Sequence, residues 1–455
     1  MEEMKALLKA QRYFYEKGKT RDIDFRIRQL LRLKSSIIKN EEEILKALKK
    51  DLNKAPFESY ATEIGMVAEE IRYLIKNVER LAQPEKVKMP ITQFPASGSI
   101  YKEPYGIVLV MAPWNYPVQL SLAPLAGAVA AGNCVILKPS EYAPNSSAVM
   151  RKIIKETFPE KYIAVVEGGM EVNKELLQNK FDYIFFTGSV SVGKIIMEEA
   201  AKHLTPVTLE LGGKSPCIVD ETADISLSAK RIAWGKYLNA GQTCVAPDYV
   251  LVQKDVKEAF IKELSRYVRK FYGKDPLNNE EYPRIVNERH FDRLLSLMKE
   301  ENISLGGKYS RQLLKIEPTV LELNSSDTPV MKEEIFGPLL PVLTYENLEE
   351  AARFINNRPK PLALYLFTTS KDNEGFIMKN ISFGGGCVND TIVHLATTSM
   401  GFGGVGESGM GSYHGKESFT TFSHSKSVLR KSNLLDIPLR YPPYKKKINL
   451  LRKIL

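Results

Sequence analysis

Four short apolar runs in the first half of the chain constrain its fold more than any other feature. They read GIVLVMAP, CVILKPS, YIAVVEG and YIFFTGS, and helix-like segments separate them. Continuous rather than alternating apolar character is typical of strands buried on both faces, and so of a parallel sheet with helical crossovers. Ligands of such sheets bind beyond the carboxyl ends of the strands. The sequence therefore predicts an α/β fold whose chemistry lies just after these runs.

The 455 residues are enough for two or three domains. Helical spacing of apolar residues dominates the first 80 residues, and residues 86–105 carry the prolines, glycine and β-formers of a hairpin. A second α/β region begins near Pro206 with PVTLELGG, PCIVD and YVLVQ. The uncharged stretch 104–137 is long enough for a membrane span, but its three internal prolines predict a buried strand, a loop and a buried helix instead.

Charge and cysteine usage narrow the class of protein. The net charge is +10, but lysines are spread among glutamates and no aromatic-rich basic motif is present, which argues against nucleic-acid binding. Four scattered cysteines without a Cys/His cluster predict neither disulfides nor a metal site, and the N-terminus lacks a signal-peptide core, so we expect a reducing, cytoplasmic compartment. The basic and apolar tail 436–455 could touch an anionic membrane, but capping of the fold is the favoured interpretation.

The run YIFFTGSVSVGK is a candidate phosphate-binding turn. Gly188, Ser189 and Gly193 follow a predicted strand and open a helix, whose N-terminus attracts phosphate. The string also matches the start of a Walker A loop, but Ile195 stands where that loop needs a Ser or Thr for magnesium. A nucleotide site is therefore favoured over a phosphoryl-transfer enzyme. The alternative is that these glycines only turn the chain.

Three further residues have both a chemical and a structural interpretation. Cys244, in NAGQTCVAP, is either a nucleophile or a small packing residue. Glu210, in VTLELGG, is either a general base acting through water or an ion-pair partner of a lysine such as Lys214. Asn115 either donates to an oxyanion or caps the following helix. Together, a thiol, an amide donor, a mobile carboxylate and a dinucleotide site suggest oxidation of an aldehyde through a thioester.

Six stretches carry a resemblance to a known family, in that family's order and approximate spacing. They are APWNYP, LKPSE, FTGSVSVGK, LELGGKSP, NAGQTCVAP and EEIFGPLLPV. The chain resembles the aldehyde dehydrogenase superfamily over nearly its whole length. It is most similar to class 3 members, which act on medium- to long-chain and aromatic aldehydes.

The resemblance implies a role for each matching residue. Cys244 is the nucleophile, Asn115 with the backbone N–H of Cys244 makes the oxyanion hole, and Glu210 is the base for thioester hydrolysis. The implied NAD(P) residues are Trp114, Lys138, Glu141, Gly188, Ser189, Gly193, Glu334 and Phe336. The implied substrate residues are Tyr116, Gln119, Trp234 and Tyr237. Since Glu141 would repel a 2′-phosphate, NAD is the expected cofactor; class 3 members often tolerate NADP as well.

The resemblance also implies an architecture. We expect an aldehyde dehydrogenase-like α/β fold with a Rossmann-type cofactor domain and an α/β catalytic domain. A small β bridging element should support a homodimer. The predicted ranges are 1–84 with 105–209 for the cofactor domain, 210–396 for the catalytic domain, 85–104 with 397–435 for the bridging element, and 436–455 for the tail.

Two rival functions remain on the same fold. One is an acylating dehydrogenase, which passes the acyl group to coenzyme A; such members generally lack a glutamate at the position of Glu210. The other is a catalytically silent binding protein, which the complete set of candidate site residues disfavours.

Overall fold

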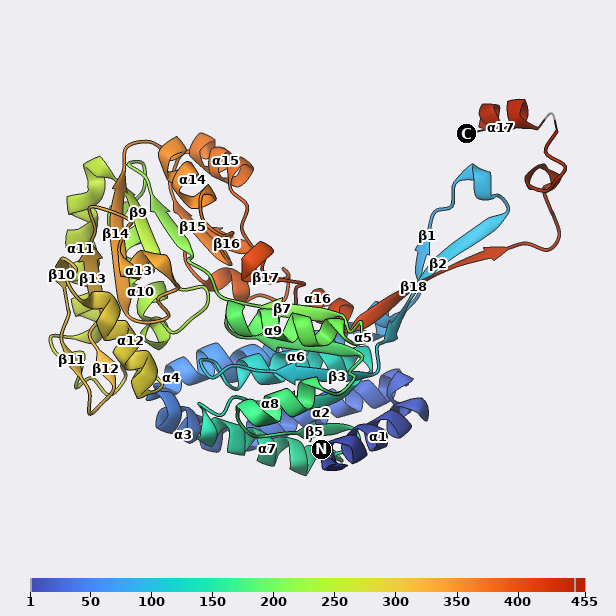
Figure 1. Ribbon diagram of the computed structural model, residues 1–455, viewed down its shortest axis with the longest axis horizontal. Helices are drawn as coiled ribbons and strands as arrows, with labels where there is room; N and C mark the ends of the chain where they lie inside the picture. The colour runs from blue at the N-terminus through green and yellow to red at the C-terminus, as the bar shows by residue number, and fades with distance from the viewer. Residues whose placement is uncertain (1, 446, 455) are drawn as a thin grey trace.

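The computed structural model describes residues 2–445 and 447–454, and it contains two α/β lobes and a long β arm (Figure 1). Both large sheets are mostly parallel, as the unbroken apolar runs predicted. The chain forms β3 to β7 of the first sheet before it starts the second, and a late segment returns to add the edge strand β17 to the first.

The first sheet has the strand order β17-β7-β6-β3-β4-β5. All neighbouring strands are parallel except β17 and β7. The four apolar runs of the sequence form β3 to β6. The strands are β3 (Ile107–Met111), β4 (Cys134–Lys138), β5 (Ile163–Val165), β6 (Tyr183–Thr187), β7 (Val207–Glu210) and β17 (Gly409–Met410).

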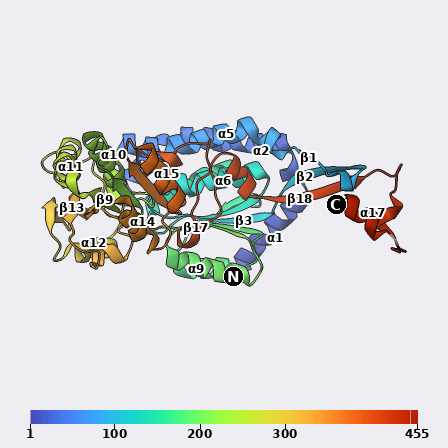
Figure 2. The same ribbon diagram turned by 90° about the horizontal axis from the view of Figure 1, so that it is seen from above.

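Helices cover both faces of this sheet. Figure 2 shows α2, α5 and α6 on one side and α9 on the opposite side. The helices of this half are α1 (Glu2–Glu16), α2 (Ile23–Lys39), α3 (Glu41–Leu52), α4 (Pro56–Ser59), α5 (Gly65–Ala82), α6 (Gln119–Ala131), α7 (Pro144–Thr157), α8 (Met170–Leu177) and α9 (Val190–Ala201).

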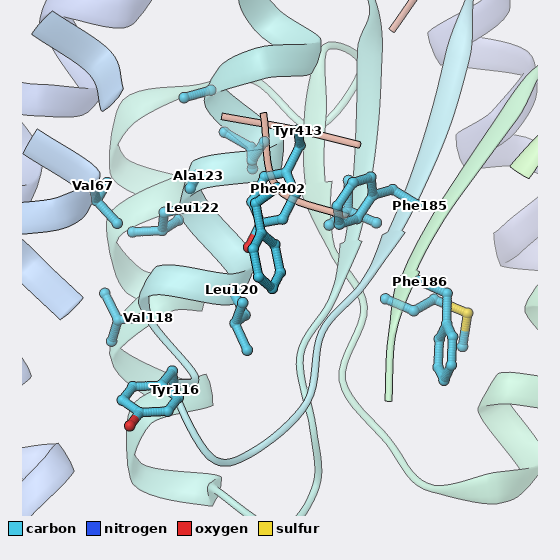
Figure 3. Close-up of a cluster of buried hydrophobic side chains, with 14 of the residues drawn as sticks. Val67, Tyr116, Val118, Leu120, Leu122, Ala123, Phe185, Phe186, Phe402 and Tyr413 are labelled. Carbon is cyan, nitrogen blue, oxygen red and sulfur yellow. The ribbon is translucent and has the colours of Figure 1, made fainter. Parts of the chain in front are cut away.

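Helix α6 explains the uncharged stretch of the sequence. All 13 of its residues are buried, and it contacts α2, α5, β3 and β4. Figure 3 shows its Leu122 and Ala123 facing Val67 of α5. The predicted succession of buried strand, loop and buried helix is therefore correct, and no helix within the described ranges is long and apolar enough to cross a bilayer.

The second sheet has the order β10-β13-β14-β9-β8-β15-β16, and only β10 runs antiparallel to its neighbour. Its strands are β8 (Pro216–Val219), β9 (Tyr249–Gln253), β10 (Ile303–Leu305), β13 (Thr319–Glu322), β14 (Leu339–Tyr345), β15 (Ala363–Phe367) and β16 (Gly385–Val388), and β11 (Tyr309–Ser310) pairs separately with β12 (Lys315–Ile316). The helices of this half are α10 (Ile225–Tyr237), α11 (Lys257–Tyr272), α12 (Glu288–Met298), α13 (Pro329–Lys332), α14 (Leu348–Asn356) and α15 (Lys371–Asn380).

The arm is a three-stranded antiparallel sheet that projects from the body (Figure 1). It consists of β1 (Glu85–Val87), β2 (Ala96–Pro104) and β18 (Ser423–Lys431). Before β18, the chain passes through α16 (Lys416–Thr421), which packs on α5 and α6. Beyond the arm, the tail carries α17 (Ile448–Ile454) beside the hairpin turn.

Candidate active site

The strand order of the first sheet reverses between β3 and β6. From β3 the chain moves outward to β4 and β5, and it then returns to the other side with β6 and β7. Trp114 and Asn115 follow β3, and Gly188 and Ser189 follow β6, so both pairs lie at this switch point. Open parallel sheets bind dinucleotides at such a point. The topology therefore fits an NAD(P) site.

The loop after β6 leads into the N-terminus of α9. Ser189 is the N-cap of α9, and its Oγ accepts a 3.4 Å hydrogen bond from the Val192 N–H. A Cβ at Gly193 would lie 2.6 Å from the Leu211 side chain, so the missing side chain lets α9 pack tightly beside β7. The open N-terminus of α9 can attract a pyrophosphate. The predicted role of these residues in cofactor binding stays a prediction.

Lys138 is the last residue of β4, and Glu141 lies in the loop that follows. The Lys138 Nζ donates to the Pro139 carbonyl at 2.8 Å and lies 3.5 Å from a carboxylate oxygen of Glu141. Burial lowers the pKa of Lys138, while Glu141 opposes that effect. The Lys138 side chain is buried and that of Glu141 is partly exposed. A lysine and a carboxylate side by side can donate to and accept from the two hydroxyls of a ribose.

The loop containing Glu334 and Phe336 reaches the ends of β3 and β7 from the second half of the chain. The ring of Phe336 lies edge-on to Trp114, with 5.4 Å between centroids. A Cβ at Gly212 would lie only 1.9 Å from a carboxylate oxygen of Glu334, so this oxygen reaches the backbone just beyond β7. Burial, and then the charge of Asp248, raise the pKa of Glu334 to about 8.

Cys244 follows a tight left-handed turn after α10. Asn239, Ala240 and Gly241 all have positive φ. A Cβ at Gly241 would lie 2.2 Å from the Gly337 carbonyl oxygen, so only glycine lets the two loops approach this closely. The Cys244 side chain reaches the wall of a cavity. Burial, and then the charges of nearby glutamates, raise its pKa to about 12, and backbone N–H groups oppose this rise.

Glu210 ends β7 with its carboxylate in the same cavity. Neither oxygen has a hydrogen-bond partner among the described residues, and burial raises the pKa of Glu210 well above its usual value. Lys214 instead forms an ion pair with Asp248 and donates to two backbone carbonyls. The ion-pair interpretation of Glu210 is therefore wrong, because neither of its oxygens has a partner among the described residues and Lys214 binds Asp248 instead.

Asn115 does not cap a helix. Helix α6 begins four residues later, and its N-cap residue is Val118, which makes no side-chain bond. The Asn115 Nδ2 donates instead to the Gln242 carbonyl at 3.0 Å. The capping interpretation is therefore wrong. Because an amide has two N–H donors, one remains for another acceptor.

The cavity itself measures about 170 Å³ and is mainly apolar. Figure 3 shows two of its aromatic residues, Phe402 and Tyr413, near Phe185 of β6. Its lining is Ala61, Thr62, Met66, Tyr116, Gln119, Leu120, Thr187, Glu210, Leu211, Trp234, Leu238, Thr243, Cys244, Leu362, Ile392, Val393, Leu395, Ala396, Phe402, Tyr413 and His414.

Three of the four predicted substrate residues lie on this lining: Tyr116, Gln119 and Trp234. Tyr237 does not. Its side chain is fully buried and its hydroxyl donates to the Thr319 carbonyl at 3.2 Å, so its place on the lining is taken by Leu238. The prediction for Tyr237 is corrected: α10 ends at this residue, and the next one turns toward the cavity.

His414 is a cavity residue without a predicted role. Its Nδ1 lies 3.4 Å from a carboxylate oxygen of Glu70, which is itself buried. The two residues are 344 positions apart, so no local sequence pattern could have predicted this contact. The only signal was the glycine-rich stretch around His414, which the sequence marks as a tight loop. Within the ranges that the structure describes, no group of three or more His, Cys, Asp or Glu could hold a metal.

Comparison with known proteins identifies the family. The aldehyde dehydrogenase family profile matches residues 2–428. The chain is 49% identical to 4,4'-diaponeurosporen-aldehyde dehydrogenase of Staphylococcus aureus, over 96% of each chain. It is 44% identical to the dimeric NADP-preferring aldehyde dehydrogenase of Canis lupus familiaris, over 97% of this chain and 98% of that protein.

Solved structures give the same result. The substrate-bound state of Staphylococcus aureus AldH superposes with a TM-score of 0.96 at 48% identity, over 99% of both chains. Betaine aldehyde dehydrogenase of the same organism, solved with NAD⁺, superposes with a TM-score of 0.85 at 28% identity, over 96% of this chain and 90% of that one. The chain belongs to the aldehyde dehydrogenase family of NAD(P)-dependent oxidoreductases.

Proposed function

We propose that the protein oxidises medium- to long-chain aliphatic or aromatic aldehydes to carboxylic acids, with Cys244 as nucleophile. One observation carries the proposal: Cys244 and Glu210 face the same apolar cavity, and both Glu210 oxygens are free of partners among the described residues. A buried carboxylate without a partner is costly, so its retention points to a chemical task.

In the first half of the reaction, the Cys244 thiolate adds to the carbonyl carbon of the aldehyde. The oxyanion that forms accepts hydrogen bonds from the free N–H of the Asn115 amide and from the backbone N–H of Cys244. Bound NAD(P)⁺ supplies the acceptor for the hydride that leaves this carbon. The electron pair of the C–H bond departs with that hydride, and a thioester remains on Cys244.

In the second half, Glu210 removes a proton from water. The resulting hydroxide adds to the thioester carbonyl, and the C–S bond breaks. Cys244 leaves as a thiolate and the product is a carboxylic acid. Because neither Glu210 oxygen is held by a neighbour within the described chain, the carboxylate can turn toward a water beside Cys244.

NAD is the proposed preferred cofactor, since the Glu141 carboxylate beside Lys138 would repel a 2′-phosphate.

A homodimer is the proposed assembly. The 397–435 segment and the 85–104 hairpin, which meet in the arm, are its proposed bridging element, and the proposed cofactor and catalytic domains are 1–84 with 105–209 and 210–396. A cytoplasmic location is also proposed.

A series of straight-chain aldehydes with benzaldehyde, run with NAD and with NADP, tests the proposal. Each methylene buried in the cavity should stabilise the transition state by about 0.8 kcal/mol. That corresponds to about a fourfold rise in kcat/KM per carbon until the cavity is filled. The product should be the free acid without coenzyme A. A strict requirement for coenzyme A, or no NADH with any of these aldehydes, would contradict the proposal.

A further inference from the structure

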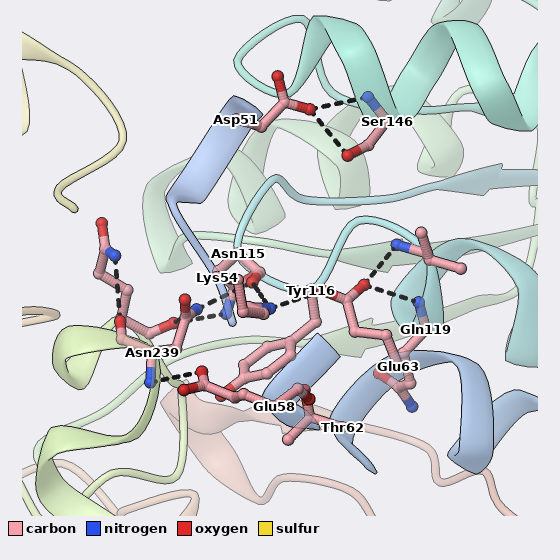
Figure 4. Close-up of polar contacts among 12 residues, drawn as sticks. Asp51, Lys54, Glu58, Thr62, Glu63, Asn115, Tyr116, Gln119, Ser146 and Asn239 are labelled. Carbon is pink, nitrogen blue, oxygen red and sulfur yellow. Dashed lines mark hydrogen bonds and ion pairs between the residues drawn. The ribbon is translucent and has the colours of Figure 1, made fainter. Parts of the chain in front are cut away.

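A buried polar cluster joins the loop that carries Asn115 to the rest of the site (Figure 4). At its centre, the Lys54 Nζ lies 2.5 Å from a Glu63 carboxylate oxygen, and neither side chain is exposed. Lys54 follows α3, and Glu63 lies in a single π-helical turn, Tyr60–Ile64. A fully buried ion pair gains little stability over apolar residues of the same size. Its presence therefore calls for another explanation.

Lys54 holds the backbone of Asn115. Its Nζ donates to the Asn115 carbonyl oxygen at 3.2 Å, and it lies over the Tyr116 ring, 4.2 Å from the centroid. The Asn239 Nδ2 donates to the same carbonyl at 2.9 Å. Asn239 in turn lies in the left-handed turn that leads to Cys244. The carbonyl of Asn115 is thus held both by Lys54 and by the Cys244 loop.

Glu63 holds the other end of the same loop. Its second carboxylate oxygen accepts from the Val118 N–H at 2.8 Å and from the Gln119 N–H at 3.4 Å. These are the N–H groups of the N-cap residue and of the first residue of α6, whose own N-cap side chain makes no hydrogen bond. The ion pair therefore fixes the span from Asn115 to Val118 between two anchors. The hydroxyls of Tyr116 and Thr243, 2.6 Å apart, add a direct contact between this span and the residue before Cys244.

We infer that Lys54 and Glu63 are positioning residues for the oxidation: they hold the Asn115 amide at the distance from Cys244 that the oxyanion requires. This inference rests on the proposed role of Asn115. The physical reason is that donors preorganised toward developing charge lose much of their effect when displaced by about 1 Å, which can cost about a hundredfold in rate.

A double-mutant cycle tests the inference. Single-turnover NADH formation is measured for Lys54→Met, Asn115→Ala and the double variant. Asn115→Ala should slow this step by about 10²–10³. Lys54→Met alone should slow it by about 10- to 100-fold, with the KM for aldehyde changed by less than about threefold. In the Asn115→Ala background, Lys54→Met should cost less than about twofold. If Lys54→Met slows NADH formation by the same factor in the wild-type protein and in the Asn115→Ala variant, the inference is overturned.

Other measurements separate positioning from general damage. Alkylation of Cys244 by iodoacetamide needs no oxyanion donor, so Lys54→Met should leave its rate unchanged; a parallel fall in alkylation and turnover would also overturn the inference. Lys257→Met is the matched control, because the Lys257–Glu322 ion pair of 2.8 Å contributes no residue to the cavity. The Lys257→Met variant should oxidise the aldehyde at the wild-type rate.

Folding is the remaining control. If the unpaired charge of Glu63 prevents Lys54→Met from folding, the variant Lys54→Met/Glu63→Gln removes both charges and takes its place in the cycle. It should show the same non-additivity with Asn115→Ala. An unimpaired Asn115→Ala would instead contradict the proposed function of Asn115, so the two failures are distinguishable.

Discussion

At the scale of single residues, Cys244 and Glu210 are both buried where a negative charge is disfavoured. Burial raises the pKa of the thiol to about 12 and raises that of the carboxyl well above its usual value. Burial therefore disfavours the ionised form of both groups, although the proposed reaction needs each of them deprotonated in turn. The donors around the sulfur, including the N–H groups of Cys244 and Val245, act in the direction of the thiolate.

Glu210→Gln separates the two halves of the reaction. The amide cannot accept a proton from water, so hydrolysis should slow by about 10²–10⁴ while thioester formation continues. Stopped-flow measurement should show an initial burst of NADH near one per active site, followed by a slow steady state. Cys244→Ala, as control, should show neither phase. Equal loss of both phases in Glu210→Gln would mean that Glu210 also serves the first step.

The pH profile should report the same carboxylate. Because burial raises the pKa of Glu210, its proton is lost only above the range of an ordinary glutamate. The base form grows as pH increases, so the rate of thioester hydrolysis should rise through this pKa. The measurement is single-turnover hydrolysis between about pH 5 and pH 9, in wild type and in Glu210→Gln. A rising limb of the same midpoint in the variant would assign it to another group.

At the scale of elements, the N-terminus of α7 is capped by a residue from another helix. Helix α7 has no side-chain cap from its own N-cap residue. Asp51 of α3 accepts hydrogen bonds from the backbone N–H of Asn145 at 3.2 Å and from that of Ser146 at 2.7 Å. Figure 4 shows the contact with Ser146. Helix α7 directly follows the loop that holds Lys138 and Glu141, so its start is tied to that loop.

Asp51→Ala should therefore destabilise the protein. It leaves buried N–H groups at the start of α7 without an acceptor, at a cost of about 1–3 kcal/mol. Thermal unfolding followed by circular dichroism should show a lower midpoint. Asp372→Ala, which removes an exposed carboxylate from the first turn of α15, should change stability by less than about 0.5 kcal/mol. Similar losses in both variants would contradict a capping role for Asp51.

At the scale of the whole molecule, the arm offers a free edge. Strand β18 pairs with β2 along nine residues, and its other edge carries no strand in the described chain. Val428 and Leu429 are 41% and 46% exposed on this strand. A long strand with an open edge and exposed apolar side chains is a template for pairing with a second chain. This geometry supports the proposed homodimer.

Val428→Glu/Leu429→Glu should weaken that dimer. Burial of an apolar side chain of this size contributes about 1.5–3 kcal/mol, so the loss of two should raise the dissociation constant by well over tenfold. Sedimentation velocity over a dilution series measures the change. Leu434→Glu, at a fully exposed position beyond β18, should leave the assembly unchanged. A double variant that stays dimeric at the dilution where wild type does would exclude this strand from the interface.

The fold was largely predictable because its strands are short, apolar and buried on both faces. The runs at β3, β4 and β6 are unbroken apolar segments, and the polar residues after them were correctly expected at one edge of the sheet. Tyr237 shows the limit of such reasoning: one residue of rotation at the end of α10 decides whether a side chain enters the core or the cavity.

The sequence by itself determined the α/β class, the family and the identity of the candidate nucleophile, donor and base, because each of these depends on local motifs. Only the tertiary structure decided the environment of those groups. Three contacts join segments that are distant in the sequence. They are the anchoring of the Asn115 loop by the Lys54–Glu63 pair, the contact of His414 with Glu70, and the pairing of β2 with β18. Such contacts depend on how helices and sheets pack, and no local pattern of residues encodes that packing.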